Sequence, residues 1–303
     1  MTKTLTFEDK QRLFADADAA RQYLEALRWP NGPVCPHCDG GKPCYAIKGN
    51  GTRSGLYKCG ACRKQFTVTV GTIFEDSHIP LNKWLFATDL ICSSKKGISA
   101  HQLHRMLGLT YKSAWFMAHR IRYAMEGALP TARLTGIVEA DETYVGGKSR
   151  GGKRGRGAEK KVPVFTMIAR DGAARSFLVG NVKGSTLKGL IRAHVVETAH
   201  IMTDNFGAYK GLEKFFAGHG VVDHNKEYVR GIIHTNFAES FFSLLKRGIL
   251  GTFHHVSEQH LQRYLAEFDF RWNARKIEDA ERSELAIKGS NGRRLMFRDS
   301  SVA

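Results

Sequence analysis

Two cysteine pairs near the N-terminus constrain the fold of this chain more than any other feature. Cys35 and Cys38 are followed, after twenty intervening residues, by Cys59 and Cys62, which is the CxxC spacing of a four-cysteine zinc ribbon. Each pair can direct two thiolates at one ion, and Zn²⁺ accepts four thiolates in a tetrahedron. The segment around them, 31–72, is too short for an apolar core of its own. We therefore expect structural zinc to hold it together, with unliganded thiols or redox-active pairs as the alternatives.

Two further cysteines, Cys44 and Cys92, have no CxxC partner. Cys44 could replace one ligand, but we expect it to be a packed or loop thiol. Four thiolates saturate a tetrahedral ion, which leaves no open position for chemistry. The ribbon is therefore expected to stabilise the fold or bind a partner, and not to react.

The charge balance indicates a polyanionic partner. Among 303 residues, 46 are Lys or Arg and 29 are Asp or Glu, which gives a formal charge of +17. Such a surface attracts nucleic acid and releases its counterions, although ribosomal and membrane-surface proteins share this balance. The first residues, MTKTLTFEDKQ, lack an apolar leader, and no run approaches the roughly 20 apolar residues that cross a bilayer. We therefore expect a cytoplasmic protein that does not enter a membrane.

Helical periodicity predicts two modules on either side of the ribbon. The first, 1–30, is expected to be an N-terminal helical segment. The second, 73–130, is expected to contain a helix over 80–94, followed by two helices separated by a break at 108–110. This second module resembles a helix-turn-helix, whose second helix would cover 110–123. A helical hairpin packed on the rest of the protein is the alternative. The residues expected to contact DNA from this helix are Lys112, Arg120 and Arg122.

From about residue 131 the pattern becomes mixed α/β. Three consecutive apolar strands, a helix, a fourth strand and a further short strand near 221–223 predict a five-stranded mixed sheet with flanking helices over 131–278. Between the first two strands, 148–161 is basic and glycine-rich, so we expect a loop that binds DNA, with a solvated linker as the alternative. Its expected DNA contacts are Arg150, Lys153, Arg154 and Arg156. The last residues, 279–303, lack periodicity and are expected to form a frayed tail.

Two of the predicted strands in this region carry carboxylates. Alternation along the first strand places Glu139 and Asp141 on one face and Glu142 on the other, while Asp204 ends a later apolar strand. Burying several acids is costly unless a cation is present, and carboxyl ends of strands in α/β sheets commonly carry ligands. Metal binding is therefore the economical interpretation.

A polar stripe follows on a predicted helix. Asn236, Glu239, Ser243 and Lys246 occur at spacings of three, four and three, so they share one helical face. Together with Asp141 and Asp204, Glu239 would complete a set of three carboxylates. Mg²⁺, or Mn²⁺, prefers such oxygen ligands and supports two-metal phosphoryl transfer. The alternative for each acid alone is a solvated or salt-bridged surface group.

Several stretches resemble one known family. RWPNGPVCPHC, VEADETYVGGK, TDNFGAY and HTNFAESFFSLLKRGILGTFHH are similar to insertion-sequence transposases of the ISXO-like group, which have an N-terminal zinc ribbon and an RNase H-like DDE domain. The resemblance implies that Asp141, Asp204 and Glu239 hold magnesium, and that Lys246, beside Arg247, contacts DNA. Members carry either Asn or Glu as the third catalytic residue. The interval to Lys246 favours Glu239, and Asn236 stays open as the alternative.

The resemblance also implies an activity and its partners. A transposase of this kind binds double-stranded DNA at element ends, cleaves at the 3′ end and transfers the strand to target DNA. Two ends must be joined together, so the active form is expected to be a homo-oligomer, at least a dimer, associated with the bacterial nucleoid. Two other functions remain: an inactive DNA-binding regulator derived from such an enzyme, and an RNase H-like nuclease that cuts without joining.

Overall fold

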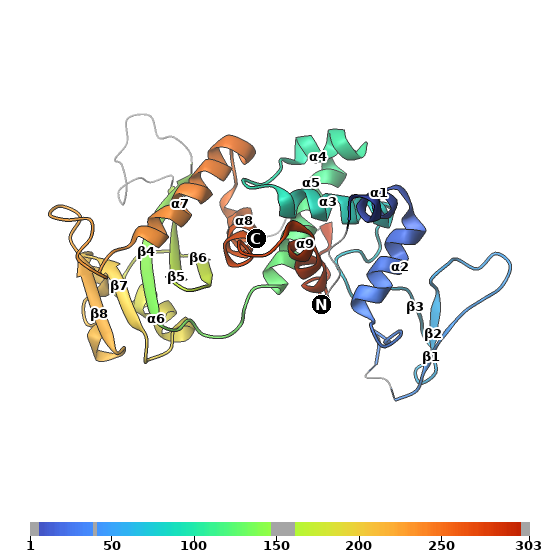
Figure 1. Ribbon diagram of the computed structural model, residues 1–303, viewed down its shortest axis with the longest axis horizontal. Helices are drawn as coiled ribbons and strands as arrows, with labels where there is room; N and C mark the ends of the chain where they lie inside the picture. The colour runs from blue at the N-terminus through green and yellow to red at the C-terminus, as the bar shows by residue number, and fades with distance from the viewer. Residues whose placement is uncertain (1–5, 39–40, 147–160, 298–303) are drawn as a thin grey trace. The chain divides into compact units, whose positions relative to one another are not determined.

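The protein forms two compact units in a computed structural model that describes residues 6–38, 41–146 and 161–297 (Figure 1). The first unit comprises Met1–Ala128 and Ile277–Ala303, and the second comprises Leu129–Lys276. The basic-loop residues Arg150, Lys153, Arg154 and Arg156 lie outside the described residues. Within the described ranges, no helix is long and apolar enough to cross a membrane.

Two short helices open the first unit, as the periodicity predicts. α1 covers Phe7–Ala15 and α2 covers Ala17–Arg28. Thr6 and Asp9 form a capping box at the start of α1, and the Asp16 carboxylate accepts backbone N–H groups at the start of α2. These caps satisfy N–H groups that a helix leaves without intrahelical partners.

The ribbon follows as a small antiparallel sheet. β1 covers Cys44–Ala46, β2 covers Tyr57–Cys59 and β3 covers Gln65–Phe66, in the order β1-β2-β3. Trp29 packs edge-on against the rings of Tyr57 and Phe66, so the ribbon rests on the end of α2. This aromatic cluster is small, which agrees with the expectation that a metal ion contributes to its stability.

Three helices complete the main part of the first unit. α3 covers Leu81–Ser93, α4 covers Ala100–Leu107 and α5 covers Tyr111–Gly127. Gly108 ends α4 in the left-handed conformation at φ 60°, and the Thr110 hydroxyl caps α5. The predicted helix, tight turn and second helix are therefore present.

Two of the DNA contacts predicted on α5 are wrong, because their side chains are buried. Arg120 is 5% exposed and Arg122 is 2% exposed. Arg120 Nη2 donates to the main-chain oxygen of Glu75 at 2.7 Å, and burial lowers the pKa of its guanidinium to about 10. Both arginines therefore point into the unit, and DNA cannot reach them in this conformation. Lys112 is exposed and remains a predicted contact.

The expected frayed tail is also wrong for its first part. α9 covers Asp279–Lys288 and packs on α3 and α2. Ser283 Oγ donates to Asp89 at 3.2 Å, and Tyr23 donates to Glu284 at 3.3 Å. The buried residues of α9 are mostly small or polar, so this helix shows little apolar periodicity in sequence and depends on its packing partners.

The second unit contains the predicted five-stranded mixed sheet. Its strands are β4 (Ile137–Gly146), β5 (Lys161–Ala169), β6 (Ala174–Leu178), β7 (His200–Asp204) and β8 (Gly218–Val222). They lie in the order β6-β5-β4-β7-β8. The first three strands are antiparallel neighbours, whereas β7 and β8 run parallel to β4. This is an RNase H-like α/β arrangement.

Helices cover both faces of this sheet. α6, Gly184–His194, covers one face, where its Leu187 and Ile191 belong to the same core as Phe165 of β5. The opposite face is covered by α7, Asn236–Gly248, and by α8, Glu258–Asn273, through a core that includes Phe241 and Leu265. A π-helical turn, Ile249–Phe253, follows α7 and separates it from α8.

Candidate functional site

Asp141 and Asp204 lie level with each other on neighbouring strands. β4 pairs in parallel with β7, and the last paired residues are Glu139 and Met202. Each aspartate lies two residues further along its own strand, so the register brings both carboxylates to the same level of the sheet. Asp204 ends β7, and its carboxylate accepts the Phe206 N–H at 3.0 Å. The sheet therefore holds both acids on rigid backbone.

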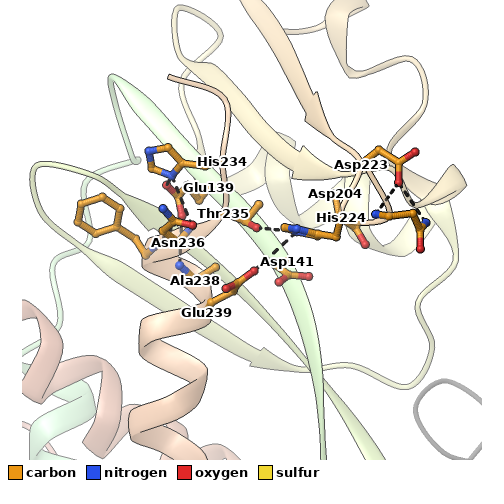
Figure 2. Close-up of polar contacts among 12 residues, drawn as sticks. Glu139, Asp141, Asp204, Asp223, His224, His234, Thr235, Asn236, Ala238 and Glu239 are labelled. Atoms are coloured by element: carbon orange, nitrogen blue, oxygen red, sulfur yellow. Dashed lines mark hydrogen bonds and ion pairs between the residues drawn. The ribbon is translucent and has the colours of Figure 1, made fainter. Parts of the chain in front are cut away.

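Glu239 reaches the same place from α7 (Figure 2). It lies in the first turn of the helix, and its side chain is 51% exposed. Burial, together with the negative charges of Glu142, Asp204 and Glu239, raises the pKa of Asp141 to about 8. Uncompensated negative charge on an all-oxygen donor set is what a divalent cation would relieve. These residues therefore fit a magnesium or manganese site.

The faces of β4 agree with the predicted alternation. Glu142 accepts the Tyr209 hydroxyl at 2.6 Å, and Tyr209 belongs to the core under α6. Glu139 instead contacts the start of α7 on the other face. Consequently Glu142 is held away from the α7 face on which Glu239 lies.

The polar stripe on α7 is exposed along its whole length. Asn236, Glu239, Ser243 and Lys246 are all exposed, whereas the opposite side of the helix packs into the core. Arg247 is also exposed, and its Nε donates to the Ser243 main-chain oxygen at 3.1 Å. A strand of DNA lying along α7 would therefore meet the third acid and two cations within three helical turns.

His224 belongs to this site and was missed by the sequence analysis. Its Nε2 lies 3.2 Å from the Thr235 hydroxyl and 3.7 Å from Glu239 Oε1 (Figure 2). It follows the end of β8, which runs parallel to β7, so both strands deliver polar residues to one edge of the sheet. That position after an apolar strand was the available signal. His224 therefore lies beside the Glu239 carboxylate, at a distance longer than a hydrogen bond.

Glu139 ties α7 to β4 and is fully buried. Its carboxylate accepts Arg170 Nε at 2.8 Å and the backbone N–H groups of Phe237 at 2.8 Å and Ala238 at 3.1 Å. His234 Nδ1 lies 3.1 Å from the same carboxylate. An acid at a helix N-terminus also interacts favourably with the helix dipole. Glu139 therefore fixes the helix that carries Glu239 against the strand that carries Asp141.

We expect Glu139→Gln to lower the free energy of unfolding by about 3 kcal/mol, because it leaves the half-buried Arg170 without its carboxylate partner. Urea unfolding of the variant and the wild type measures this difference. The matched control is Glu258→Gln, an exposed acid at the start of α8, which should shift stability by less than about 0.5 kcal/mol. Equal unfolding midpoints for Glu139→Gln and wild type would contradict a stabilising role for the buried Glu139 carboxylate.

The four ribbon cysteines form one cluster. Their sulfur atoms lie within 4.8 Å of one another, with Cys35 and Cys62 at 3.7 Å and Cys38 and Cys59 at 3.7 Å. Backbone N–H groups of His37 and Ala61 each approach a cysteine sulfur at 3.4 Å. This set fits a tetrahedral zinc ion. Cys44 lies opposite Cys59 on β1 but is not one of the four.

Comparison with known proteins defines the class to which this fold and these sites belong. A family profile described as the ISXO2-like transposase domain matches residues 133–273, and one described as the transposase zinc-ribbon domain matches 15–65. An uncharacterized protein in transposable element ISH50 of Halobacterium salinarum is 31% identical over 278 residues, which covers 86% of this chain and 92% of that protein. A transposase-like protein of Haemophilus influenzae is 28% identical over 100 residues, 33% of this chain and 80% of its own length.

The chain therefore belongs to the ISXO2-like transposase family. Membership implies DNA binding, and the zinc-ribbon match together with the cysteine cluster supports structural Zn²⁺.

Proposed function

We propose that this transposase cleaves a phosphodiester at each end of its mobile element and joins the freed 3′-OH to target DNA. The observation that carries the proposal is that Asp141 and Asp204 lie level on neighbouring strands, with Glu239 of α7 beside them (Figure 2). Burial and the charges of the nearby acids raise the pKa of the half-buried Asp141. Asp141, Asp204 and Glu239 would hold Mg²⁺ or Mn²⁺. When bound, such ions activate the attacking oxygen and stabilise the leaving oxygen of an in-line displacement.

The protein groups around the acids fix their geometry. The register between β4 and β7 sets the separation of Asp141 and Asp204, while Glu139 sets the position of α7. His224 lies 3.7 Å from the Glu239 carboxylate. Catalytic geometry tolerates errors of only about 0.5 Å, so groups that lock these side chains matter as much as the acids.

DNA contacts would come from both units. Lys246 and Arg247 lie further along the exposed face of α7, where their cationic groups can bind the phosphate backbone. Lys112, the zinc ribbon and the predicted contacts in 148–161 would add affinity for the element ends. Because transposition joins two ends, we propose that the active form contains at least two chains.

The direct test is an assay of purified protein with Mg²⁺ or Mn²⁺ and oligonucleotides that carry candidate element ends, compared with Asp204→Ala. We expect metal-dependent cleavage and joined products from the wild type only. No metal-dependent product from the wild type would contradict the proposal and leave the DNA-binding regulator as the better account. Cleavage without joining would instead support a nuclease.

A pair of variants separates the two candidates for the third ligand. We expect Glu239→Gln to reduce strand joining by about 100-fold or more, because it removes a negative charge from the cation site. Asn236→Ala is the matched change one helical turn earlier and should cost less than about fivefold, since Asn236 contributes no charge. Full activity of Glu239→Gln together with loss in Asn236→Ala would transfer the role to Asn236.

A further inference from the structure

A hollow lies in the second unit, away from the three carboxylates. It has a volume of 510 Å³ and is lined by Arg133, Gly189, Arg192, Ala193, Glu197, Lys214, Phe215 and Phe216. We call it the α6 pocket, because Arg192 lies in the last turn of α6. Its size falls in the range of pockets that hold small ligands.

Topology separates the α6 pocket from the candidate active site. Arg133, Glu197 and Phe216 immediately precede β4, β7 and β8, so they lie where these parallel strands begin. Asp204 ends β7. A five-residue strand spans roughly 15 Å at about 3.3 Å per residue. A group bound in the α6 pocket therefore lies near the starts of these strands, whereas the candidate active site lies near their ends.

The charged lining of the α6 pocket favours an anion. Arg133, Arg192 and Lys214 face a single acid, Glu197, among the lining residues, which gives three positive charges and one negative charge. Arg133 Nη2 donates to the main-chain oxygen of Arg192, so this contact fixes the Arg133 guanidinium beside the last turn of α6. Arginine guanidinium groups match phosphate oxygens in geometry and charge.

An aromatic side chain completes the α6 pocket. Phe215 is 40% exposed, although the neighbouring Phe216 is buried at 7%. The Arg192 guanidinium carbon lies 4.5 Å from the centroid of the Phe215 ring. A ring and a guanidinium plane held together form a platform on which a nucleobase can stack.

We propose that the α6 pocket binds one unpaired nucleotide of a DNA strand, at a distance from the cleavage position. Arg133, Arg192 and Lys214 hold its phosphate, and its base stacks on the pair formed by Phe215 and Arg192. A base inside a duplex cannot reach this platform, so the pocket distinguishes single-stranded from double-stranded DNA. The proposal rests on the proposed function only in taking DNA as the ligand, and it requires no catalysis.

The test measures binding of a labelled oligothymidylate and of a duplex of equal length by fluorescence anisotropy, without added divalent cation. Stacking contributes about 1–3 kcal/mol per base, so Phe215→Ala should weaken single-strand binding by about 5-fold to 100-fold and duplex binding by less than about twofold. Phe215→Tyr should retain wild-type affinity because it keeps the ring. Arg192→Ala should weaken binding of both oligonucleotides, and it should reduce the dependence of affinity on salt concentration by about one phosphate contact.

Two controls make the outcome decisive. Phe7→Ala removes an exposed phenylalanine from the first unit and should bind both probes like the wild type. The measurement contains no divalent cation, so a failure of catalysis does not affect it. Unchanged single-strand affinity in Phe215→Ala, or equal losses on single strand and duplex, would overturn the proposal. Thermal unfolding of each variant verifies that it is folded.

Discussion

Replacing Asp141 by asparagine is expected to reduce DNA cleavage and joining by at least about 10³-fold, which corresponds to roughly 4 kcal/mol of transition-state stabilisation. The substitution keeps the size of the side chain and removes the negative charge that a divalent cation would neutralise. The measurement is the initial rate of product formation with Mg²⁺ and labelled element ends. Loss of one carboxylate from a shared site removes both cation affinity and the alignment of the reacting oxygens.

Folding of this variant should not suffer. Burial and neighbouring acids raise the pKa of Asp141 to about 8, so the folded protein prefers the neutral form of this group below that pH. Relative to an unfolded carboxyl, a raised pKa means that stability falls as pH rises from about 4 towards 8. Asparagine is neutral at every pH, so Asp141→Asn should be at least as stable as the wild type at pH 7 without added metal. Loss of activity then reports on the site and not on unfolding.

The neighbouring acid provides a matched control. Glu142→Gln changes the next residue of β4, but this side chain is held by Tyr209 on the α6 face. Glutamine can still accept that hydroxyl, so activity should stay within about threefold of wild type, a change of less than about 1 kcal/mol. An inactive Glu142→Gln together with an active Asp141→Asn would contradict the assignment of Asp141, and not Glu142, to the active site.

Replacing Cys59 by serine is expected to abolish zinc binding by the ribbon and to unfold that part of the first unit. Structural zinc contributes roughly 10–16 kcal/mol of apparent binding free energy in small zinc domains, more than a sheet of three short strands supplies by itself. Metal analysis of the purified protein should give one zinc per wild-type chain and none in the variant. Proteolysis of the ribbon should accelerate in the variant, and a chelator should have the same effect on wild type.

Cys44→Ser is the control for this measurement. Cys44 lies opposite Cys59 in the ribbon sheet, but its sulfur is not one of the four in the cluster. It should therefore retain one zinc per chain. Zinc retained in Cys59→Ser and lost in Cys44→Ser would show that Cys44 replaces Cys59 as a ligand.

Local patterns were sufficient to predict much of this protein. The CxxC spacing predicts the cysteine cluster, because two short turns in a small ribbon leave the thiols few other arrangements. Strand alternation predicts that Asp141 and Glu142 lie on opposite faces of β4, and helical spacing predicts the exposed stripe from Asn236 to Lys246. The strand and helix patterns each depend on residues within one strand or about three turns of helix.

Features that depend on distant partners were not predictable in this way. Arg120 and Arg122 resemble surface cations in sequence. Arg120 is nevertheless buried, and its guanidinium donates to the main-chain oxygen of Glu75, 45 residues away in sequence. α9 forms because α2 and α3 provide a surface for its weak apolar side. Glu139 looks like one more acid in an acidic strand until Arg170 and the start of α7 are seen around it. Such long-range pairings leave no periodic signal in the sequence.

The central claim is that Asp141, Asp204 and Glu239 together hold the divalent cations that drive DNA cleavage and joining. The most direct test counts Mn²⁺ bound to the protein in complex with element-end DNA, by electron paramagnetic resonance of wild type and Asp141→Asn. We expect saturable Mn²⁺ binding in the wild type and its loss in the variant, while both proteins keep their ribbon zinc. Equal Mn²⁺ affinity in the two proteins would contradict the claim.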